Sequence, residues 1–400
     1  SSDVCSSDLP LACDTWDDRD IEAIKSVIKS GRYTMGPKVA QFEKEFALKF
    51  GSKHAVMVNS GSTANLLMIG ALVLNPRYKL SPGDEVIVPA VSWSTTFFPV
   101  TQYGLKLVFV DIDRDTLNID PEKVKAAVTP NTKAILAVNL LGNSCDWHSL
   151  KKIAAEHDLL LLEDNCESLG ATYEGRALGT MGVIGTFSFF FSHHMQTMEG
   201  GMILTDDEEL AQYMRSMRAH GWIRDLPHAN CIHTKSGDPF EDSFKFVLPG
   251  YSVRPLEMSG AIGSVQLEKM PGMIEARRKN AMLMKQAFKD IKSVQLQKEV
   301  GNSSWFGFSI VLQGNLEGKR KEVIKKLSAN GVENRPIVAG NFTKNPVISY
   351  CPHEIRGSLS AAEYIDSNGF FIGNDSRDLS AEISEVANIM TDLSKNDYNI

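Results

Sequence analysis

The chain has little cysteine, and the cysteines that it has are scattered. They are Cys5, Cys13, Cys145, Cys166, Cys231 and Cys351. No two of them form a CxxC pair, so the sequence offers neither a zinc site, nor an iron–sulfur cluster, nor a disulfide framework. Such usage is typical of a reducing compartment. We therefore expect no metal site and a cytoplasmic protein.

A surplus of positive charge and long apolar runs are absent as well. The 400 residues include 42 Lys and Arg against 49 Asp and Glu, which gives a formal net charge of -7 at pH 7. Without a basic surplus the surface cannot neutralise the phosphates of a nucleic acid. Apolar stretches such as residues 85–91 have the length of strands, far below the roughly 20 residues of a membrane span. We expect no nucleic-acid partner and no membrane insertion.

The first eight residues, SSDVCSSD, are polar and low in complexity. They lack the basic start and the apolar core of a signal peptide. We expect a non-native leader, with the chain proper beginning near Leu9 or Pro10. The composition as a whole, with 43% hydrophobic and 23% charged residues, is ordinary for a globular enzyme of about two domains.

Short apolar runs alternate with amphipathic stretches between residues 53 and 205. Such runs, separated by helices, predict an α/β fold with a mostly parallel sheet covered on both faces. The expected strands are Ala55–Val58, Glu85–Val88, Lys106–Val110, Ala134–Val138, Leu159–Leu162, Thr186–Phe191 and Met202–Leu204. The expected helices between them are Thr63–Val73, Pro121–Ala127 and Trp147–His157.

The pattern changes after residue 205. A helical stretch is followed by a polar, irregular segment over residues 221–250, and a long helix is expected from Leu256 to about Asp290. A strand at Trp305–Leu312 and helices at 318–330 and 381–392 complete the prediction. We expect a large cofactor-binding domain over residues 10–269 and a smaller C-terminal α+β domain over residues 270–400.

Two polar segments at strand ends could form part of a cofactor site. Asn59-Ser-Gly-Ser-Thr-Ala-Asn65 opens a helix, where backbone N–H groups, hydroxyls and the helix dipole suit a phosphate. The same residues also make a good turn and helix cap, and this structural interpretation is as well supported as a phosphate site. In the segment Val88–Thr96, Trp93 could stack on a flat ring, although taken alone a buried core tryptophan is the favoured interpretation.

Two further segments carry titratable groups. In Leu161–Ser168, an acid at the end of a central strand lies where open α/β sheets place ligands. Such a carboxylate can keep a pyridine nitrogen protonated, although either Glu163 or Asp164 could instead cap a helix. In Gly185–Gly201, a strand leads into a polar turn with two histidines. Adjacent histidines point in different directions, so a shared metal site is not expected.

The order and spacing of these four segments resemble the DegT/DnrJ/EryC1/StrS sugar aminotransferase family. Its members are fold-type I enzymes similar to aspartate aminotransferase, and the resemblance runs from about Pro10 into the C-terminal region. In ordinary members, the lysine that binds pyridoxal phosphate follows the serine of a Ser-Phe strand by five residues. Counting from Ser188 leads to His193, and no lysine occurs between Lys152 and Lys235.

This replacement changes the chemistry that the resemblance implies. A lysine amine bonds covalently to the cofactor aldehyde, whereas imidazole has no primary amine. Imidazole can still accept and donate a proton near neutral pH. We therefore expect a non-covalent cofactor, pyridoxal phosphate or pyridoxamine phosphate, with His193 as the catalytic acid–base group.

A histidine at this position resembles the 3-dehydratases that lead to 3,6-dideoxyhexoses such as colitose. The stretches that carry this resemblance are Ser92–Thr96, Asn139–Asn143, Glu163–Ser168, Ser192–His194, Arg254–Gly260 and Arg335–Val338. It implies removal of the C3 hydroxyl from a nucleotide-linked 4-keto-6-deoxyhexose, with glutamate as amino donor. The absence of clustered cysteines favours the GDP-sugar enzymes over the related CDP-sugar enzyme, which carries an iron–sulfur cluster.

The resemblance also assigns cofactor contacts. It places Gly61, Ser62, Thr63 and Ser188 at the phosphate. It places Trp93 over the ring and Asp164 at the pyridine nitrogen. Glu167 departs from the Gln or His common in the aminotransferases and matches the dehydratases, and we expect it near the cofactor hydroxyl.

Other residues are assigned to the substrate or to a neighbouring subunit. A homodimer with shared active sites is implied, and it places His220, as a substrate contact, and Ser252, as a cofactor contact, on loops that approach the partner's site. Family members usually carry Asn where this chain has Ser252, which leaves that contact to the partner's phosphate open. Glu333 and Arg335 are expected on the substrate side, although a surface ion pair is the simpler reading.

Two rival functions stay open at the level of sequence. One is a sugar-nucleotide 4-aminotransferase that uses histidine as its base. The other is a catalytically inert, cofactor-binding regulator. An acid at the pyridine position and a competent acid–base group both argue against the inert regulator, whereas the aminotransferase is separated only by the mass of the product.

Overall fold

A mostly parallel sheet forms the centre of the molecule, as the sequence predicts. The computed structural model describes residues 9–395, so the expected leader of eight residues lies outside the described part of the chain. In this part of the chain, eight strands follow the order β1-β9-β8-β5-β4-β2-β3-β13. They are β1 (His54–Val58), β2 (Glu85–Pro89), β3 (Lys106–Val110), β4 (Thr132–Val138), β5 (Leu160–Asp164), β8 (Ile184–Ser188), β9 (Gly201–Thr205) and β13 (His353–Ile355). The pairs from β13 to β8 are parallel, and β9 runs antiparallel to both β8 and β1.

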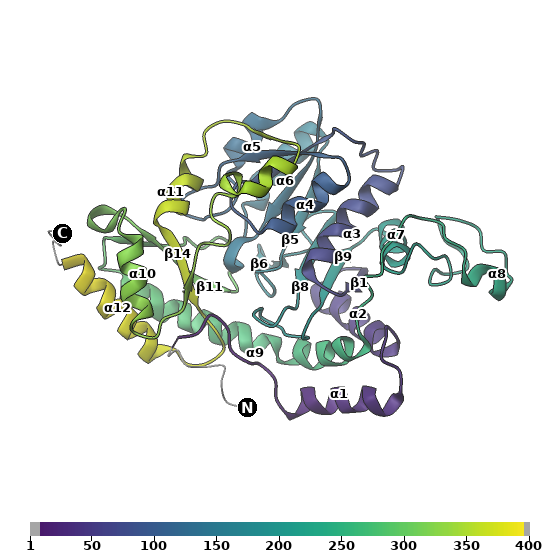
Figure 1. Ribbon diagram of the computed structural model, residues 1–400, viewed down its shortest axis with the longest axis horizontal. Helices are drawn as coiled ribbons and strands as arrows, with labels where there is room; N and C mark the ends of the chain where they lie inside the picture. The colour runs from purple at the N-terminus through teal and green to yellow at the C-terminus, as the bar shows by residue number, and fades with distance from the viewer. Residues whose placement is uncertain (1–8, 396–400) are drawn as a thin grey trace.

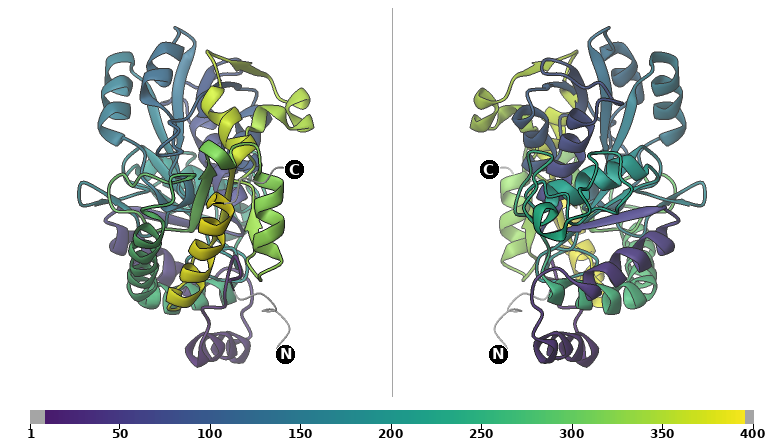
Figure 2. Two further views of the ribbon diagram at one scale, coloured as in Figure 1. Left: turned by 90° about the vertical axis from the view of Figure 1, so that its left-hand side faces the viewer. Right: turned by 90° about the vertical axis from the view of Figure 1, so that its right-hand side faces the viewer.

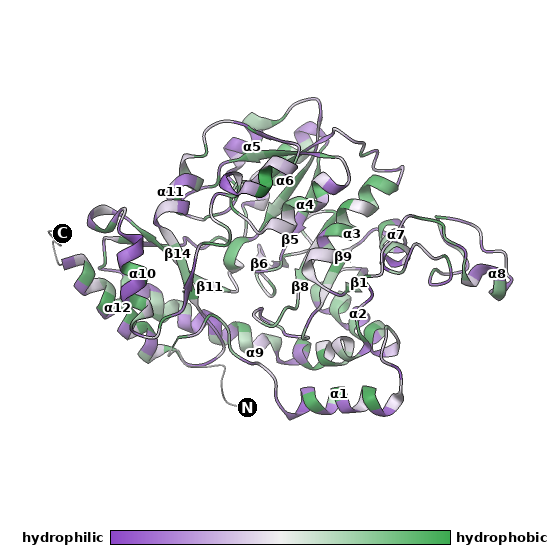
Figure 3. Ribbon diagram, in the orientation of Figure 1, coloured by the Kyte–Doolittle hydropathy of each residue, from purple (hydrophilic) through white to green (hydrophobic). Residues whose placement is uncertain are grey.

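Helices cover both faces of this sheet because successive strand residues point to opposite sides. One face packs against α3 (Gly61–Leu74), α4 (Ser94–Gln102) and α7 (Glu208–Arg218). The other face packs against α2 (Pro37–Phe50), α5 (Pro121–Ala127) and α6 (Trp147–His157). The central strands are apolar along most of their length, as Figure 3 shows, since neither face meets water.

One predicted strand is wrong at its C-terminal end. The apolar run Phe189–Phe191 continues the pattern of β8, but the strand stops at Ser188. The N–H of Phe189 donates to the carbonyl of Gly200, and the N–H of Thr197 donates to the carbonyl of Phe189. These bonds close a loop between β8 and β9, and the two histidines lie on that loop.

A second, antiparallel sheet of four strands lies beside the first. Its order is β10-β11-β14-β12. The strands are β10 (Val294–Leu296), β11 (Gly307–Leu312), β12 (Asn334–Arg335) and β14 (Gly369–Gly373). Its apolar side packs against the end of α9 (Glu257–Phe288) together with α10 (Arg320–Ser328) and α12 (Ser380–Lys395).

The long helix α9 links the two halves of the molecule. It contacts α2 and α1 (Asp18–Ser30) at one end and α12 at the other, and it runs along the lower edge of the molecule in Figure 1. The expected domain boundary between residues 269 and 270 falls inside this helix and stays a prediction. In the turned views, α1 forms the lowest edge of the molecule (Figure 2).

The polar segment over residues 221–250 forms an arm that projects from the body. It contains the short helix α8 (Pro239–Ser243), which lies at the far right of Figure 1. The exposed fractions of Phe240 and Phe244 are 89% and 72%. Besides four short 3-10 helices among the described residues, the remaining elements are α11 (Ser360–Asn368) and the small hairpin of β6 (Thr172–Tyr173) and β7 (Arg176–Ala177). Between residues 9 and 395, no helix is both long and apolar enough to cross a membrane.

A buried ion pair fastens β13 to the edge of the large sheet. Glu85 is 3% exposed, and both of its oxygens accept bonds from the guanidinium of Arg356, Nη1 at 2.9 Å and Nη2 at 2.5 Å. Thr129 donates to the same carboxylate at 2.7 Å. The bonds from Arg356 lower the pKa of Glu85 from its ordinary value of 4.5 to about 2.

This pair predicts how stability depends on pH. We expect Glu85→Gln to lower the free energy of unfolding by about 2 kcal/mol near neutral pH, because Arg356 loses its buried partner and keeps only the more exposed Glu354. Since the folded-state pKa is depressed, the pair's contribution is present above pH 4.5 and is lost as the pH falls towards 2. Urea unfolding of both proteins across this range checks the prediction. Parallel stability curves for the two proteins would contradict it.

Candidate active site

A cavity of about 560 Å³ opens at the carboxyl ends of the central strands, a size typical of small-molecule sites. The ends of β5 and β8, the start of α3 and the loop after β8 all contribute to it. Its lining brings together most of the residues predicted from sequence: Gly61, Ser62, Trp93, Asp164, Glu167, Ser188, His193 and Arg335. No lysine is among the described residues that line it.

Asp164 is the last residue of β5 and is held in one orientation. Its Oδ2 accepts from Asn65 Nδ2 and from Thr96 Oγ1, each at 2.8 Å. Since the Thr96 hydroxyl donates to Asp164, Ser92 must donate to Thr96, at 2.9 Å. Asn65 is itself fixed by the Thr186 hydroxyl at 2.6 Å. The network holds the carboxylate as an acceptor at the base of the cavity.

Glu163, the neighbouring acid, points away from the cavity and has a structural role. It is fully buried and accepts the N–H groups of Gly179, Met181 and Gly182. Burial raises the pKa of Glu163 to about 7. Of the two acids, only Asp164 lines the cavity, since adjacent strand residues face opposite sides.

The start of α3 forms an anion cradle beside Ser188. Among the described residues, the Ser60 hydroxyl caps the N–H of Thr63, which leaves the N–H groups of Gly61 and Ser62 at the free helix end. A Cβ on Gly61 would lie 2.6 Å from the Cβ of Ser188, so only glycine permits this close approach. The Thr63 hydroxyl donates to Asn59 Oδ1 at 2.7 Å and does not line the cavity. Its predicted phosphate contact stays a prediction.

Trp93 lies at the mouth of the cavity, at the N-cap of α4. Its side chain is 58% exposed, which excludes the core position that the sequence also allowed. An exposed indole at the mouth of this cavity is available for stacking on a flat ring.

His193 lies on the loop between β8 and β9 and faces the cavity. The backbone N–H of His193 donates to the backbone carbonyl of Phe190, and the ring Nδ1 of His193 lies 3.5 Å from the Ser192 hydroxyl. Burial, and secondarily the positive charge of Arg277, lowers the pKa of His193 to about 4. At neutral pH the imidazole is therefore uncharged and ready to accept a proton.

His194 points elsewhere. It is 1% exposed, its Nε2 lies 3.1 Å from the carbonyl of Ser304, and it does not line the cavity. Burial lowers the pKa of His194 well below its usual value. Of the two histidines, only His193 is therefore placed for chemistry in this cavity.

Glu167 lines the cavity below Asp164. Its Oε2 accepts the N–H of Leu141 at 2.9 Å, and Leu141 has the left-handed backbone angle φ 53°. Burial and the nearby Asp164 raise the pKa of Glu167 to about 7. Near neutral pH this carboxyl can therefore act either as a hydrogen-bond donor or as an acceptor.

The two residues predicted on the substrate side separate. Arg335, on β12, lines the cavity with an exposed guanidinium. Glu333 instead accepts the N–H of Leu11 at 3.0 Å, outside the cavity lining. No ion pair between the two is present among the described residues, and the substrate role of Glu333 stays a prediction.

The two residues predicted at a subunit boundary lie at the base of the projecting arm. His220 has φ 62°, and its ring centroid lies 4.5 Å from that of Trp222. Ser252 is exposed and pairs with Ala219 through an isolated bridge. Neither lines this chain's own cavity.

Several residues that shape the cavity were not predicted. Asn65 and Thr96 lie inside the segments quoted from sequence, and each helps to orient Asp164. Phe306, Val338 and Phe371 come from the second half of the chain and form an apolar wall. Val338 lies in the quoted stretch Arg335–Val338, but no local pattern marks Phe306 or Phe371, because only the packing of the second sheet against the first brings them to the site.

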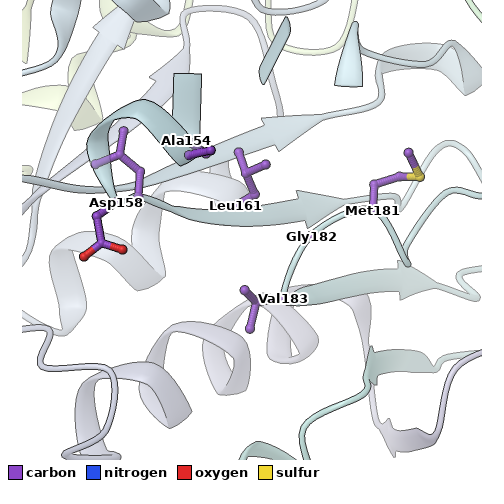
Figure 4. Close-up of a pocket in the computed structure, with 8 residues that line it drawn as sticks. Ala154, Asp158, Leu161, Met181, Gly182 and Val183 are labelled. Carbon is purple, nitrogen blue, oxygen red and sulfur yellow. The ribbon is translucent and has the colours of Figure 1, made fainter. Parts of the chain in front are cut away.

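A smaller hollow of about 300 Å³ lies at the opposite end of β5. Figure 4 shows Ala154, Leu161, Met181 and Val183 around it, with the carboxylate of Asp158 at its edge. It holds none of the predicted site residues. The groups suited to chemistry therefore gather in the larger cavity.

The residues of the larger cavity fit a pyridoxal-type cofactor held without a covalent bond. The helix N-terminus with Ser62 and Ser188 suits a phosphate, an exposed indole suits the ring, and a fixed carboxylate suits a pyridinium nitrogen. The position beside them carries imidazole in place of an amine. This donor set matches the expected non-covalent cofactor.

Comparisons with known proteins point the same way. The sequence matches the DegT/DnrJ/EryC1/StrS aminotransferase family over residues 14–391. A GDP-4-keto-6-deoxy-D-mannose 3-dehydratase of Yersinia pseudotuberculosis is 56% identical over 384 residues, covering 96% of this chain and 98% of that protein. Two crystal structures of GDP-4-keto-6-deoxymannose-3-dehydratase share 53% identity and a TM-score of 0.94, over 96% of this chain and 100% of theirs. One is a histidine-to-asparagine mutant with bound GDP-perosamine, and the other holds a trapped PLP-glutamate geminal diamine.

Proposed function

Because the chain belongs to the DegT/DnrJ/EryC1/StrS aminotransferase family, we propose that it removes the C3 hydroxyl from GDP-4-keto-6-deoxy-D-mannose. The product is GDP-4-keto-3,6-dideoxy-D-mannose, a precursor of colitose. Glutamate is the amino donor and becomes 2-oxoglutarate. Sugar substrate and glutamate together yield deoxygenated sugar, 2-oxoglutarate and ammonia, which balances all atoms.

One observation carries this proposal: the cavity presents a neutral imidazole where the family's aminotransferases present an amine. A bound pyridoxamine phosphate supplies an amine for the sugar ketone and a ring that accepts electrons. Without a lysine in the cavity, no residue can hold the cofactor covalently. This favours loss of the hydroxyl over delivery of an amino group to the sugar.

His193 moves the proton. Its uncharged imidazole accepts a proton within the cavity and donates it to the C3 hydroxyl of the sugar as that group leaves as water. Asp164 keeps a proton on the pyridine nitrogen through its fixed carboxylate. The two groups divide the work: one transfers a proton and the other stabilises charge.

The remaining cavity residues bind and orient. Gly61, Ser62 and Ser188, together with Thr63, hold the cofactor phosphate, and Trp93 covers the ring. Glu167 binds beside the cofactor hydroxyl. Arg335 is the cationic residue in the cavity lining and binds an anionic group of the substrate.

We place the enzyme in the cytoplasm as a homodimer with shared active sites. The exposed phenylalanines of the arm, with Phe246 58% exposed, support burial against a second copy. His220 and Ser252, at the base of the arm, would then face the partner's cavity. Light scattering on the purified protein checks this, and a monomer would contradict it.

The stoichiometry of the reaction tests the proposed function. With cofactor, glutamate and GDP-4-keto-6-deoxymannose, we expect ammonia and 2-oxoglutarate to appear in equal amounts. Equal amounts follow because each turnover consumes one amino group and releases it again. Formation of 2-oxoglutarate without ammonia would contradict the proposal, and so would a failure of glutamate to convert bound pyridoxal phosphate to the amine form.

A further inference from the structure

The ring of Phe306 lies against both histidines of the loop. Its centroid is 5.3 Å from the His193 ring, with the planes 68° apart, and 5.6 Å from the His194 ring. Phe306 also lines the cavity, close to Phe371. The contact with His193 is edge-to-face, a geometry that favours one orientation of its ring, whereas the contact with His194 is tilted by 58°. His193 therefore has an aromatic surface behind it that reaches the site from the other half of the molecule.

The backbone of Phe306 is held at both of its polar groups. Its N–H donates to the carbonyl of Leu141 at 3.1 Å, and its carbonyl accepts from Arg277 Nη1 at 3.0 Å. Leu141 in turn donates its own N–H to Glu167. Phe306 is thus tied to the cofactor side of the cavity through Leu141 and to α9 through Arg277.

Arg277 is buried beneath this contact. It is 4% exposed, and it also donates to the carbonyl of Asn374. The residue before Phe306, Trp305, has φ 49°, a left-handed angle that is rare for a bulky side chain. The turn that delivers Phe306 to the histidines is therefore locally costly and is held by its hydrogen bonds.

We propose that Phe306 is a positioning residue, whose ring orients His193 and keeps water from its far side during proton transfer. The inference rests on the proposed function of His193. An imidazole that rotates freely would spend little time aligned with the reacting atoms, and a hydrated one would lose its neutral form more readily. Phe306 prevents both.

The charged and titratable groups around His193 define the background for a pH test. Arg277, on α9, adds positive charge. His194 and Glu199 lie near His193 on the same loop. The cavity lining adds a further set: Asp164, Cys166, Glu167 and Arg335. A substitution at Phe306 removes none of these charges, so its effect on His193 reports on contact and hydration.

The test combines an NMR titration with kinetics. In wild-type protein, the imidazole of His193, identified among the nine histidines by comparison with His193→Asn, should stay neutral to about pH 4. In Phe306→Ala we expect its pKa to rise by about one unit or more towards the ordinary value of 6.5, because water reaches the ring. The acid limb of kcat/KM should move up by the same amount, and kcat should fall by about 10- to 100-fold.

Matched variants separate positioning from loss of stability. Phe306→Tyr keeps the ring and should retain most of kcat. Phe306→Leu keeps an apolar group, and its kcat should lie between those of Phe306→Tyr and Phe306→Ala. Phe308→Leu alters a buried ring on β11 that packs against Trp305 outside the cavity, and it should leave the pKa of His193 unchanged. If Phe306→Ala does not fold, Phe306→Leu serves in its place.

An unchanged pKa of His193 and an unchanged kcat in a folded Phe306 variant would overturn the inference. A shift of equal size in Phe308→Leu would overturn it as well. Failure of the proposed function would look different. In that case His193→Asn would keep its turnover, while the NMR titration would still report whether Phe306 controls the imidazole.

Discussion

His193→Asn should reduce turnover of the GDP-sugar by about 10³-fold, because asparagine keeps a similar shape and polarity but cannot exchange a proton near neutral pH. The phosphate site proposed at Gly61 and Ser62 is untouched by this change, and so is Asp164. Binding of cofactor and of GDP-sugar should therefore change little. Steady-state kinetics and calorimetric titration measure the two effects separately.

The adjacent histidine provides the matched control. His194→Asn removes a buried ring whose Nε2 lies beside the Ser304 carbonyl, outside the cavity. We expect it to lower the melting temperature and to retain most of the turnover. If instead His194→Asn abolished turnover while His193→Asn kept it, the assignment of the two histidines would be reversed.

Asp164→Asn should lower kcat by about 100-fold or more, with a smaller change in cofactor affinity. A neutral amide cannot hold the positive charge on a pyridinium nitrogen, so the ring becomes a poorer electron acceptor. In wild-type protein both carboxylate oxygens accept hydrogen bonds, Oδ2 from Asn65 and Thr96 and Oδ1 from the N–H of Cys166, but the amide has only one oxygen. One of these donors must lose its acceptor.

The neighbouring carboxylate separates this effect from general damage. Glu163→Gln alters an equally buried acid on the same strand, but one that binds the backbone of residues 179–182. We expect it to cost stability while kcat of the folded protein stays near wild type. Single-turnover absorbance changes with glutamate measure the cofactor step in both variants. Equal kcat losses in the two variants would show that Asp164 has no specific role.

The sequence predicts the central sheet well for a physical reason. Its strands are buried on both faces, so they appear as short apolar runs, and the predicted Lys106–Val110 has the bounds of β3 itself. The same signal failed at Phe189–Phe191, where apolar residues continue although backbone bonds to Thr197 and Gly200 turn the chain away. β13 was not predicted, since three residues at a sheet edge carry no pattern of their own.

The predicted site divides in the same way. Asp164 ends β5, and His193 lies on the loop that follows β8, so both belong to local segments that the sequence pattern marks. Glu333 and Arg335 look equivalent in the sequence, yet one binds the N-terminal segment and the other lines the cavity. Phe306 has no local signal at all, because its place beside His193 depends on the packing of the second sheet.

The mass of the sugar product tests the central claim most directly. Purified protein is incubated with pyridoxal phosphate, glutamate and GDP-4-keto-6-deoxymannose, and the nucleotide sugar is analysed by mass spectrometry. The account predicts a product that has lost one oxygen atom and gained no nitrogen. A product in which the ketone oxygen is replaced by an amino group, with the C3 hydroxyl retained, would contradict it and would establish a 4-aminotransferase instead.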